Sequence, residues 1–169
     1  MKISSAVGAV LCLVMAGCAS LGGLARGVQA PTFRAASGQQ SEIRLVGPSL
    51  ERPLGGVAVR LYAEVTNPNP VGITLAALRG NLALEGTDAA GVDFPLGLPL
   101  TAGGSSVVPL DISISFADLP RLAQLIPQAL DRGAVDYQLN GTVSVDAGLL
   151  GQPTFGPMPL FAGTLATRR

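Results

Sequence analysis

Few side chains in this sequence could carry out chemistry, and the most reactive types are nearly absent. The 169 residues contain no histidine, and the only cysteines are Cys12 and Cys18. Catalytic triads built on histidine, zinc sites of the usual nitrogen and sulfur type, and histidine pH switches are therefore excluded. Carboxylates could still act as a paired general acid and base, or bind calcium.

Five aspartates are the candidates for such carboxylate chemistry. They fall in separate turns and strand faces, without the D-x-D-x-D-G spacing of a calcium loop. We interpret them as solvated surface groups, and we predict no enzymatic activity, no metal and no cofactor. The five are Asp88, Asp93, Asp131, Asp136 and Asp146.

The composition also argues against nucleic acid as a partner. Eleven Lys and Arg balance eleven Asp and Glu, so no basic field attracts phosphates. The chain has no Trp, and two Tyr and five Phe offer few platforms on which bases could stack. The run Gly103-Gly104-Ser105-Ser106 could cradle an anion, but no Lys follows it, and we interpret it as a hairpin turn.

The beginning of the chain carries the pattern of an export signal. Lys2 supplies a positive charge, and residues 3–15 form an apolar run that is too short for a spanning helix. The segment ends in Val14-Met15-Ala16-Gly17-Cys18, which resembles the lipobox of bacterial lipoproteins. The resemblance implies that residues 1–17 are removed and that Cys18 is lipidated. The alternative is an ordinary signal peptide whose cleavage region contains a cysteine.

The lipobox makes covalent lipid the expected link to a membrane. Two or more acyl chains give stable attachment where one is marginal. Asp after the cysteine commonly retains such lipoproteins in the inner membrane, whereas this chain has Ala19, so the resemblance implies the outer membrane, on its periplasmic side. Residues 18–40 are expected to be a flexible tether, although Leu21, Leu24 and Val28 could mark one or two helical turns.

Two short motifs could be recognition surfaces or parts of the structure. Asn67-Pro68-Asn69 follows a strongly alternating segment, and we interpret it as a turn that ends a strand, with a recognition surface as the alternative. Asp136-Tyr137-Gln138 lies within another such segment. Tyr137 falls on its apolar positions, so we interpret it as a core aromatic whose hydroxyl is satisfied, and a ligand contact is the alternative.

Alternation of apolar and polar residues marks the strands that must position these motifs. A two-residue period buries one face of a strand and leaves the other in water. The composition of Asp88-Ala89-Ala90-Gly91 predicts a turn, and Pro95 and Pro99 predict an edge strand or a bend at residues 92–100. About seven strands are expected, at residues 41–46, 57–66, 78–85, 92–100, 107–116, 134–146 and 154–166.

One segment, residues 118–131, has a helical period instead. Its apolar residues share one stripe, at Leu119, Leu122, Ala123, Ile126 and Leu130. Pro120 suits the first helical position, whereas Pro127 in the interior should kink or split the helix.

These elements predict an all-β fold with one short kinked helix near 118–131. Seven strands of this kind close most naturally as an antiparallel β-sandwich of the immunoglobulin or fibronectin-III kind, with the helix covering one end. We expect a single domain over residues 41–166, and a monomer.

The order of features resembles the late-embryogenesis-abundant type 2 domain, also called the water-stress-and-hypersensitive-response (WHy) domain. The resemblance rests on AEVTNPNPVGITLAALRGNLALEG at 63–86, the strand at 107–116, the helix, and VDYQLNGTVSVDAGLLGQPTFGPMPL at 135–160. Its most specific pieces are Asn67-Pro68-Asn69 and Asp136-Tyr137-Gln138. The resemblance implies a small β-sandwich with a helix, no catalytic machinery, and an association with protection under water deficit.

Two functions follow as expectations. The first is a non-enzymatic, lipid-anchored envelope protein that protects against desiccation or water stress, and it follows from the lipobox together with the family resemblance. The alternative is an adaptor, or a lipid- or ligand-binding module, that docks onto an envelope assembly. An exposed apolar cleft would favour the alternative.

Overall fold

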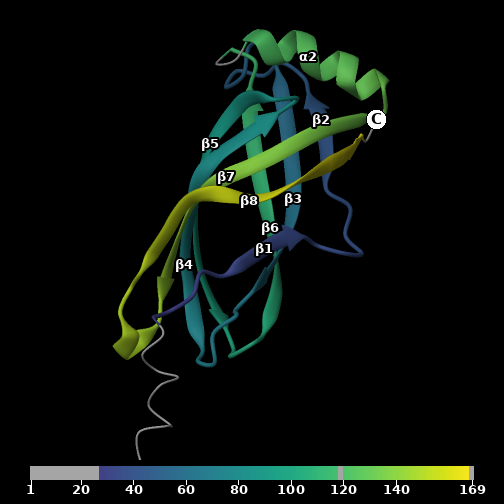
Figure 1. The fold of residues 1–169 in the computed structure, drawn as a ribbon. Helices are drawn as coiled ribbons and strands as arrows, with labels where there is room; N and C mark the ends of the chain where they lie inside the picture. Colours follow the sequence, from purple (N-terminus) through teal and green to yellow (C-terminus); the bar gives the residue numbers. More distant parts are fainter. Residues whose placement is uncertain (1–26, 118–119, 168–169) are drawn as a thin grey trace, which may run out of the picture.

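The structure is a computed structural model that describes residues 27–117 and 120–167. Within these residues the chain forms eight strands, one α-helix and a short 3-10 helix, so the all-β class is confirmed (Figure 1). The elements in order are β1 (Thr32–Ala35), β2 (Glu42–Val46), β3 (Gly56–Thr66), β4 (Ile73–Leu84), β5 (Thr87–Leu100), β6 (Ser105–Ser115), α2 (Pro120–Asp131), β7 (Ala134–Asp146), η1 (Gly148–Leu150) and β8 (Thr154–Thr167).

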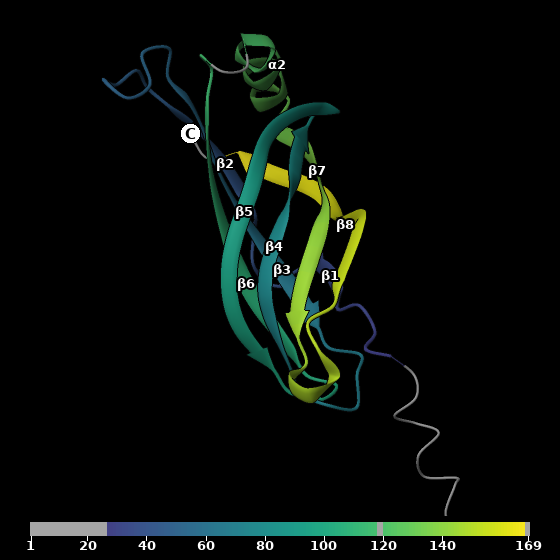
Figure 2. The ribbon, with the colours of Figure 1, turned by 90° about the vertical axis from the view of Figure 1, so that its left-hand side faces the viewer.

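The strands form two layers that are joined at one edge. In the first layer β3 pairs antiparallel with β6 along its whole length, while β1 and β2 share its other edge. In the second layer the antiparallel order is β5-β4-β7-β8. The expected sandwich is therefore present, and Figure 2 shows its two layers from the side.

One pairing departs from the expected antiparallel arrangement. β2 and β8 run parallel, with Glu42 opposite Ala166, and this short pairing joins the two layers into one mixed sheet. β1 and β2 pair with different parts of the same β3 edge. β2 uses one of its edges for β3, and its other edge pairs with a strand of the second layer.

The core lies between the layers, where the alternation of the strands predicted it. In β3 the side chains of Val57, Leu61 and Val65 are at most 1% exposed. Leu82 of β4 and Leu139 of β7 are fully buried in the opposite layer. The burial of one face per strand is the source of most of the folding free energy.

β4 contains a change of phase that the sequence also shows. Ile73 and Leu75 are buried at odd positions, and Leu78 and Leu82 are buried at even ones. A β-bulge lies between Leu75 and Ala77, where one extra residue reverses the direction of every later side chain. The brief alternation before residue 78 therefore belongs to the same strand.

The expected turn at Asp88-Ala89-Ala90-Gly91 is wrong. The chain turns at Glu85 and Gly86, which both have positive φ, and residues 88–91 are already part of β5. Composition misled here because small residues also suit a strand at the edge of a sheet. Among the described strands β5 pairs with β4 alone, and it carries Pro95 and Pro99, so the prediction of an edge strand is confirmed.

The helix begins at Pro120, as predicted, and covers the upper end of the sandwich in Figure 1. Leu122, Ile126 and Ala129 are fully buried, whereas Ala123, expected on the same stripe, is exposed. The helix is not split at Pro127. Its buried residues lie on both sides of that proline in the sequence, so packing holds the two halves together. Leu119 lies outside the described residues.

The expected tether, residues 18–40, is partly folded. Thr32–Ala35 forms β1 and pairs with Ala63–Thr66 of β3. The four residues of β1 are too few for their alternation to be recognised in the sequence. In the described part, no helix is long and apolar enough to cross a bilayer.

Candidate functional site

In the motif Asn67-Pro68-Asn69, at the lower end of the sandwich, the two asparagines are buried and Pro68 is exposed. Among the residues that the structure describes, Asn67 and Asn69 are the polar residues in the buried class, with 0% and 4% exposure. A buried amide that lacks hydrogen bonds would be costly. The contacts of these two side chains therefore indicate what the motif does.

Asn67 connects two turns. Its Nδ2 donates to the carbonyl oxygens of Val71 at 2.8 Å and Thr101 at 2.9 Å. Its Oδ1 accepts from the backbone N–H of Asn69 at 3.0 Å and from the Asn69 Nδ2 at 2.9 Å. The β3–β4 turn is thereby fixed to the β5–β6 turn.

Asn69 fixes the N-terminal segment to the same place. Its Oδ1 accepts from the Gln29 backbone N–H at 2.7 Å, and its Nδ2 donates to the Gln29 carbonyl at 3.0 Å. We call Asn67, Asn69 and the Gln29 backbone the asparagine clamp. All the side-chain donors and acceptors of both asparagines meet protein groups, which supports the interpretation of the motif as a structural turn.

The second motif lies at the start of β7, near the helix. The backbone of Asp136 exchanges hydrogen bonds with Glu85: its N–H donates to Glu85 Oε1 at 2.9 Å, and its carbonyl accepts from the Glu85 N–H at 2.9 Å. Asp136 Oδ1 also accepts from the Thr164 hydroxyl at 3.1 Å. Gln138 is exposed and donates to Asn140 Oδ1 at 3.0 Å.

Tyr137 is a core residue, as the alternation indicated, and is 4% exposed. Its ring meets Phe161 edge to face, with the centroids 5.9 Å apart. Burial raises the pKa of Tyr137, and a hydrogen bond with Ser41 acts in the opposite direction. A Cβ on Gly163 would lie 3.1 Å from the Tyr137 hydroxyl oxygen, so glycine there leaves room for the ring.

The structure does not bring the two motifs together. Asn67 follows the end of β3, where Thr66 pairs with Ser105, while Tyr137 pairs with Gly163 near the start of β7. In Figure 1 these positions lie toward opposite ends of the molecule. The motifs therefore form two structural sites and no common binding surface.

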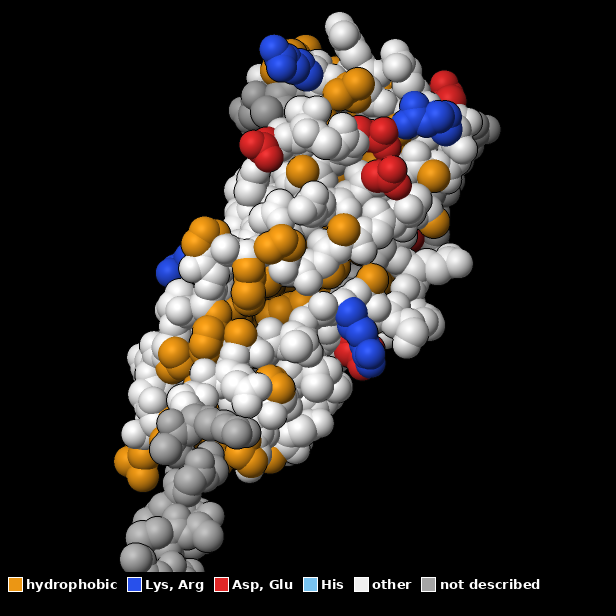
Figure 3. All heavy atoms as spheres, in the orientation of Figure 1, with side chains coloured by type: hydrophobic (Ala, Val, Ile, Leu, Met, Phe, Trp, Pro, Cys, Tyr) orange, Lys and Arg blue, Asp and Glu red, His pale blue; other side chains and the backbone are white. Residues whose placement is uncertain are grey.

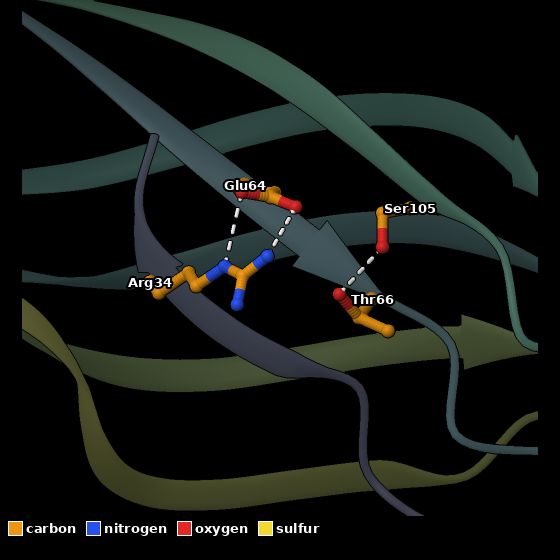
Figure 4. Close-up of polar contacts among 4 residues, drawn as sticks. All are labelled: Arg34, Glu64, Thr66 and Ser105. Atoms are coloured by element: carbon orange, nitrogen blue, oxygen red, sulfur yellow. Dashed lines mark hydrogen bonds and ion pairs between the residues drawn. The ribbon is translucent and has the colours of Figure 1, made fainter. Parts of the chain in front are cut away.

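Exposed ion pairs cross the outer faces of the strands. The guanidinium of Arg34 on β1 donates to both carboxylate oxygens of Glu64 on β3, at 3.0 and 2.7 Å (Figure 4). Beside this pair, the hydroxyl oxygens of Thr66 and Ser105 lie 2.7 Å apart. The hydrogen bond from Arg34 lowers the pKa of Glu64 and raises that of Arg34.

Two further pairs follow the same cross-strand pattern, Arg60 with Asp111 and Arg79 with Asp93. A third pair, Arg132 with Glu85, connects the turn after the helix to the β4–β5 turn. The neighbouring Asp111 raises the pKa of Arg60. These pairs fix strand register more than they add stability, because exposed ion pairs contribute little free energy.

The hollows on the described surface are shallow; the one between β5 and β6 has a mainly apolar lining, and the one over β2 and β3 a mainly polar one. One of about 380 Å³ lies along the seam between β5 and β6, lined by Asn81, residues 88–91 and residues 113–115. Another of about 330 Å³ lies over β2 and β3 and includes Glu42, Arg60 and Asp111. Within the described ranges, no three His, Cys, Asp or Glu side chains are placed to hold a metal ion.

Residues 62–158, more than half of the chain, match the family model described as Late embryogenesis abundant protein. The chain belongs to this family. The match includes both motifs, and it confirms the resemblance drawn from the sequence. No curated protein matches the late embryogenesis abundant (LEA) chain significantly.

Several solved structures of low sequence identity match the LEA chain, and the one with a TM-score of 0.50 shares its fold. A solution structure from Arabidopsis thaliana matches with a TM-score of 0.50 and 14% identity, covering 85% of this chain and 82% of that one. A solution structure described as a late embryogenesis abundant (LEA) protein matches with a TM-score of 0.47 and 17% identity, covering 95% and 86%. A crystal structure from Archaeoglobus fulgidus matches with a TM-score of 0.42 and 10% identity, covering 85% and 99%.

Charged and hydrophobic side chains are distributed unevenly over the LEA chain. On the face drawn in Figure 3, most charged side chains lie in the upper half, and hydrophobic ones cover much of the lower half. At the lower tip, Leu149 of η1 is fully exposed and Leu150 is 48% exposed. At the upper end, Leu50 is fully exposed and Leu54 is 64% exposed.

Two features of the LEA chain were not predicted from the sequence. Gln29 contacts Asn69 across forty positions through its backbone, so no side-chain pattern marks it. Leu149 and Leu150 lie between the two last predicted strands, and the signal that the sequence offers there is a pair of adjacent leucines between glycines. Cys18 lies outside the described residues.

Proposed function

We propose that this protein is a non-enzymatic, lipid-anchored member of the LEA family that protects the cell envelope under water deficit. The observation that carries the proposal is the family match over residues 62–158. The lipobox ending at Cys18 adds the anchor, and the Ala19 that follows it favours the outer membrane.

The electrostatics of the described surface support a role without catalysis. Four groups have a shifted pKa: ion pairing moves Arg34, Arg60 and Glu64, and burial moves Tyr137. All four shifts go away from neutral pH, whereas a general acid or base works best with a pKa near the operating pH. The strand faces instead carry paired charges that keep the surface hydrated.

The protective role is tested by drying and rehydrating a labile enzyme with the purified protein. The expected result is greater recovery of enzyme activity than with an equal mass of an unrelated β-sandwich protein. Equal recovery with the two proteins would contradict the protective role.

The anchor is tested by growing cells with labelled palmitate. Label should enter the wild-type protein and the Cys12→Ala variant, and it should be lost from Cys18→Ala, because only the Cys18 thiol would accept the lipid. Cys12→Ala is the matched control, since it removes the other cysteine. Labelling that survives in Cys18→Ala would contradict the anchor.

The seam between β5 and β6 favours the adaptor as a second candidate. Each of these strands uses one edge for its neighbour in the sheet, and the hollow at residues 88–91 and 113–115 lies between them. An extended segment of a partner could add to a sheet edge of this kind. Crosslinking in cells from a photoreactive group at Ser113 should capture one reproducible partner, and its failure to do so would dismiss the adaptor.

A further inference from the structure

We propose that the η1 loop, residues 147–153, is a membrane-docking element that inserts Leu149 and Leu150 into the surface of the bilayer to which the protein is anchored. The inference rests on the lipid anchor of the proposed function. It adds an orientation: the lower end of the sandwich faces the lipid, and the helix-covered end faces away.

The first support is the exposure of the two leucines. Leu149 is fully exposed and Leu150 is about half exposed, at the tip of a loop with glycine on either side. Gly148 and Gly151 have φ of 60° and 91°, values that L side chains rarely adopt. The loop thereby projects apolar side chains into solvent, where they gain nothing for the fold.

The second support is the rigid construction of the loop. Asp146 accepts from the Gly148 N–H at 2.8 Å and from Gln152 Nε2 at 3.1 Å. The Ala147 N–H donates to the Gly151 carbonyl at 2.9 Å, which closes the loop. Because the loop is already ordered, inserting it would cost little conformational entropy.

The third support is the place where the N-terminal segment meets the sandwich. The asparagine clamp holds Gln29 beside Asn69. In Figures 1 and 2 the first described residues, 27–31, lie at the same lower end that carries η1. Gln29 lies eleven positions after Cys18, and even a fully extended chain of that length reaches about 40 Å. A lipid on Cys18 therefore keeps this end of the sandwich near the bilayer.

The fourth support is the absence of charge from the segments that meet at this end. Residues 27–31, 67–72, 101–104 and 147–153 contain no Asp, Glu, Lys or Arg. Asp146 borders the loop, and its carboxylate is hydrogen-bonded within it, to the Gly148 N–H and the Gln152 side chain. Charged groups near the lipid would lose hydration, so their absence lowers the cost of contact. The absence of Lys and Arg also means that anionic lipid gives no added attraction. The chemistry fits a bilayer surface contacted through apolar side chains alone.

The opposite end provides a comparison within the same molecule. Leu50 and Leu54 are also exposed, in the loop between β2 and β3. That loop contains Glu51 and Arg52, and the charged residues Arg121 and Asp131 lie on the helix nearby. It begins where Val46 pairs with Gly56, at the end of β3 away from Asn67. Leu50 is therefore a matched control for Leu149.

The chain has no Trp, which allows a single-tryptophan test. Leu149→Trp and Leu50→Trp would be purified from membranes as full-length chains and reconstituted into phosphatidylcholine vesicles that contain brominated lipid. We expect a blue-shifted emission with several-fold stronger bromine quenching for Leu149→Trp, and water-like, unquenched emission for Leu50→Trp. Thermal unfolding of both variants confirms that they fold.

Further variants and lipid mixtures test whether the loop contacts the bilayer through apolar side chains. Adding Leu150→Ser to the Leu149→Trp chain should lower the ratio of docked to undocked protein about tenfold. This factor corresponds to losing the free energy of burying about one leucine side chain. Quenching should not change when phosphatidylglycerol is added. Quenching only with phosphatidylglycerol would overturn apolar docking, and so would a blue shift that rises with protein density without quenching, which would indicate a second copy of the chain.

The test separates the docking loop from the anchor. Mass spectrometry of the N-terminal peptide of the same samples reports whether Cys18 carries lipid. If the Leu149→Trp chain is lipidated and its tryptophan stays in water, the docking loop is overturned and the anchor is intact. If the tryptophan of a Leu149→Trp chain without lipid is quenched, the loop is supported and the anchor is overturned.

Discussion

The two ends of the sandwich are stabilised by different physics. At the upper end the helix buries Leu122, Ile126 and Ala129 against the strands. At the lower end the turns meet through buried amides, with Asn67 and Asn69 as the central residues. Apolar packing tolerates small adjustments in side-chain position, whereas a buried amide network requires all its partners. We therefore expect the lower end to tolerate fewer residue types, and the upper end to contribute more to the free energy of unfolding.

The largest effect is expected at the upper end. Ile126→Ala should lower the free energy of unfolding by about 2–5 kcal/mol, because it removes a fully buried side chain and leaves a cavity. Urea unfolding measures the change. Ala123→Ser, on the exposed face of the same helix, is the control and should have little effect. A loss at Ile126 that is no larger than the control would break the comparison.

The next effect is expected at the lower end. Asn67→Ala should lower the free energy of unfolding by about 1–3 kcal/mol, because the carbonyl of Thr101 and the Asn69 amide lose their partner. Gln138→Ala removes an amide whose hydrogen bond is exposed, and it should change stability far less. Equal losses in the two variants, measured by urea unfolding, would mean that the clamp has no special role.

A smaller effect, which depends on pH, is expected at the buried hydroxyl of Tyr137. Tyr137→Phe should cost about 0.5–1.5 kcal/mol at neutral pH, since it removes one hydrogen bond and keeps the ring. Burial raises the pKa of Tyr137 in the folded state above the usual value of 10.0. The stability that the neutral hydroxyl contributes is therefore fully present below pH 10.0, and it is lost as pH rises from there through the folded pKa. The wild type should therefore lose its advantage over Tyr137→Phe in alkaline solution. Melting temperatures of both proteins from about pH 7 to about pH 11 would check this.

The smallest effect concerns the exposed Arg34–Glu64 pair between β1 and β3. Arg34 lowers the folded pKa of Glu64 below its usual value of 4.5, so the pair stabilises the fold above that pH and loses its effect as pH falls through the folded pKa. Glu64→Gln should lower the melting temperature slightly at neutral pH, and the difference from wild type should disappear in acid. Glu51→Gln is an exposed control. A gap between wild type and Glu64→Gln that widens in acid would reverse the assignment.

Alternation in the sequence predicted most of the strands because burial of one face is a local property. Even the bulge in β4 left a trace, as a change from odd to even apolar positions between Leu75 and Leu78. The same logic placed Tyr137 in the core and made Asn67 a turn residue. The start of the helix at Pro120 also followed from a local rule.

The remaining features depend on contacts between distant residues. β1 is four residues long and became a strand only because the β3 edge beside Thr66 was open to it. The parallel pairing of β2 with β8 joins residues more than a hundred positions apart, and nothing in either strand specifies direction. The contact of Gln29 with Asn69 uses backbone atoms of Gln29, which every sequence carries. Pro127 was expected to kink or split the helix; the helix continues across it because the packing of residues on both sides outweighs the local cost of the proline.

The position of Gln29 also determines how mechanical tension would enter the fold. β1 lies antiparallel to β3, with Thr32 beside Thr66, so a pull on the N-terminal side acts along the strand axis. The backbone bonds of β1 and the two bonds between Gln29 and Asn69 would then be loaded together in shear, instead of opening one after another. A fold loaded in this way would resist unfolding under tension applied at its N-terminal side.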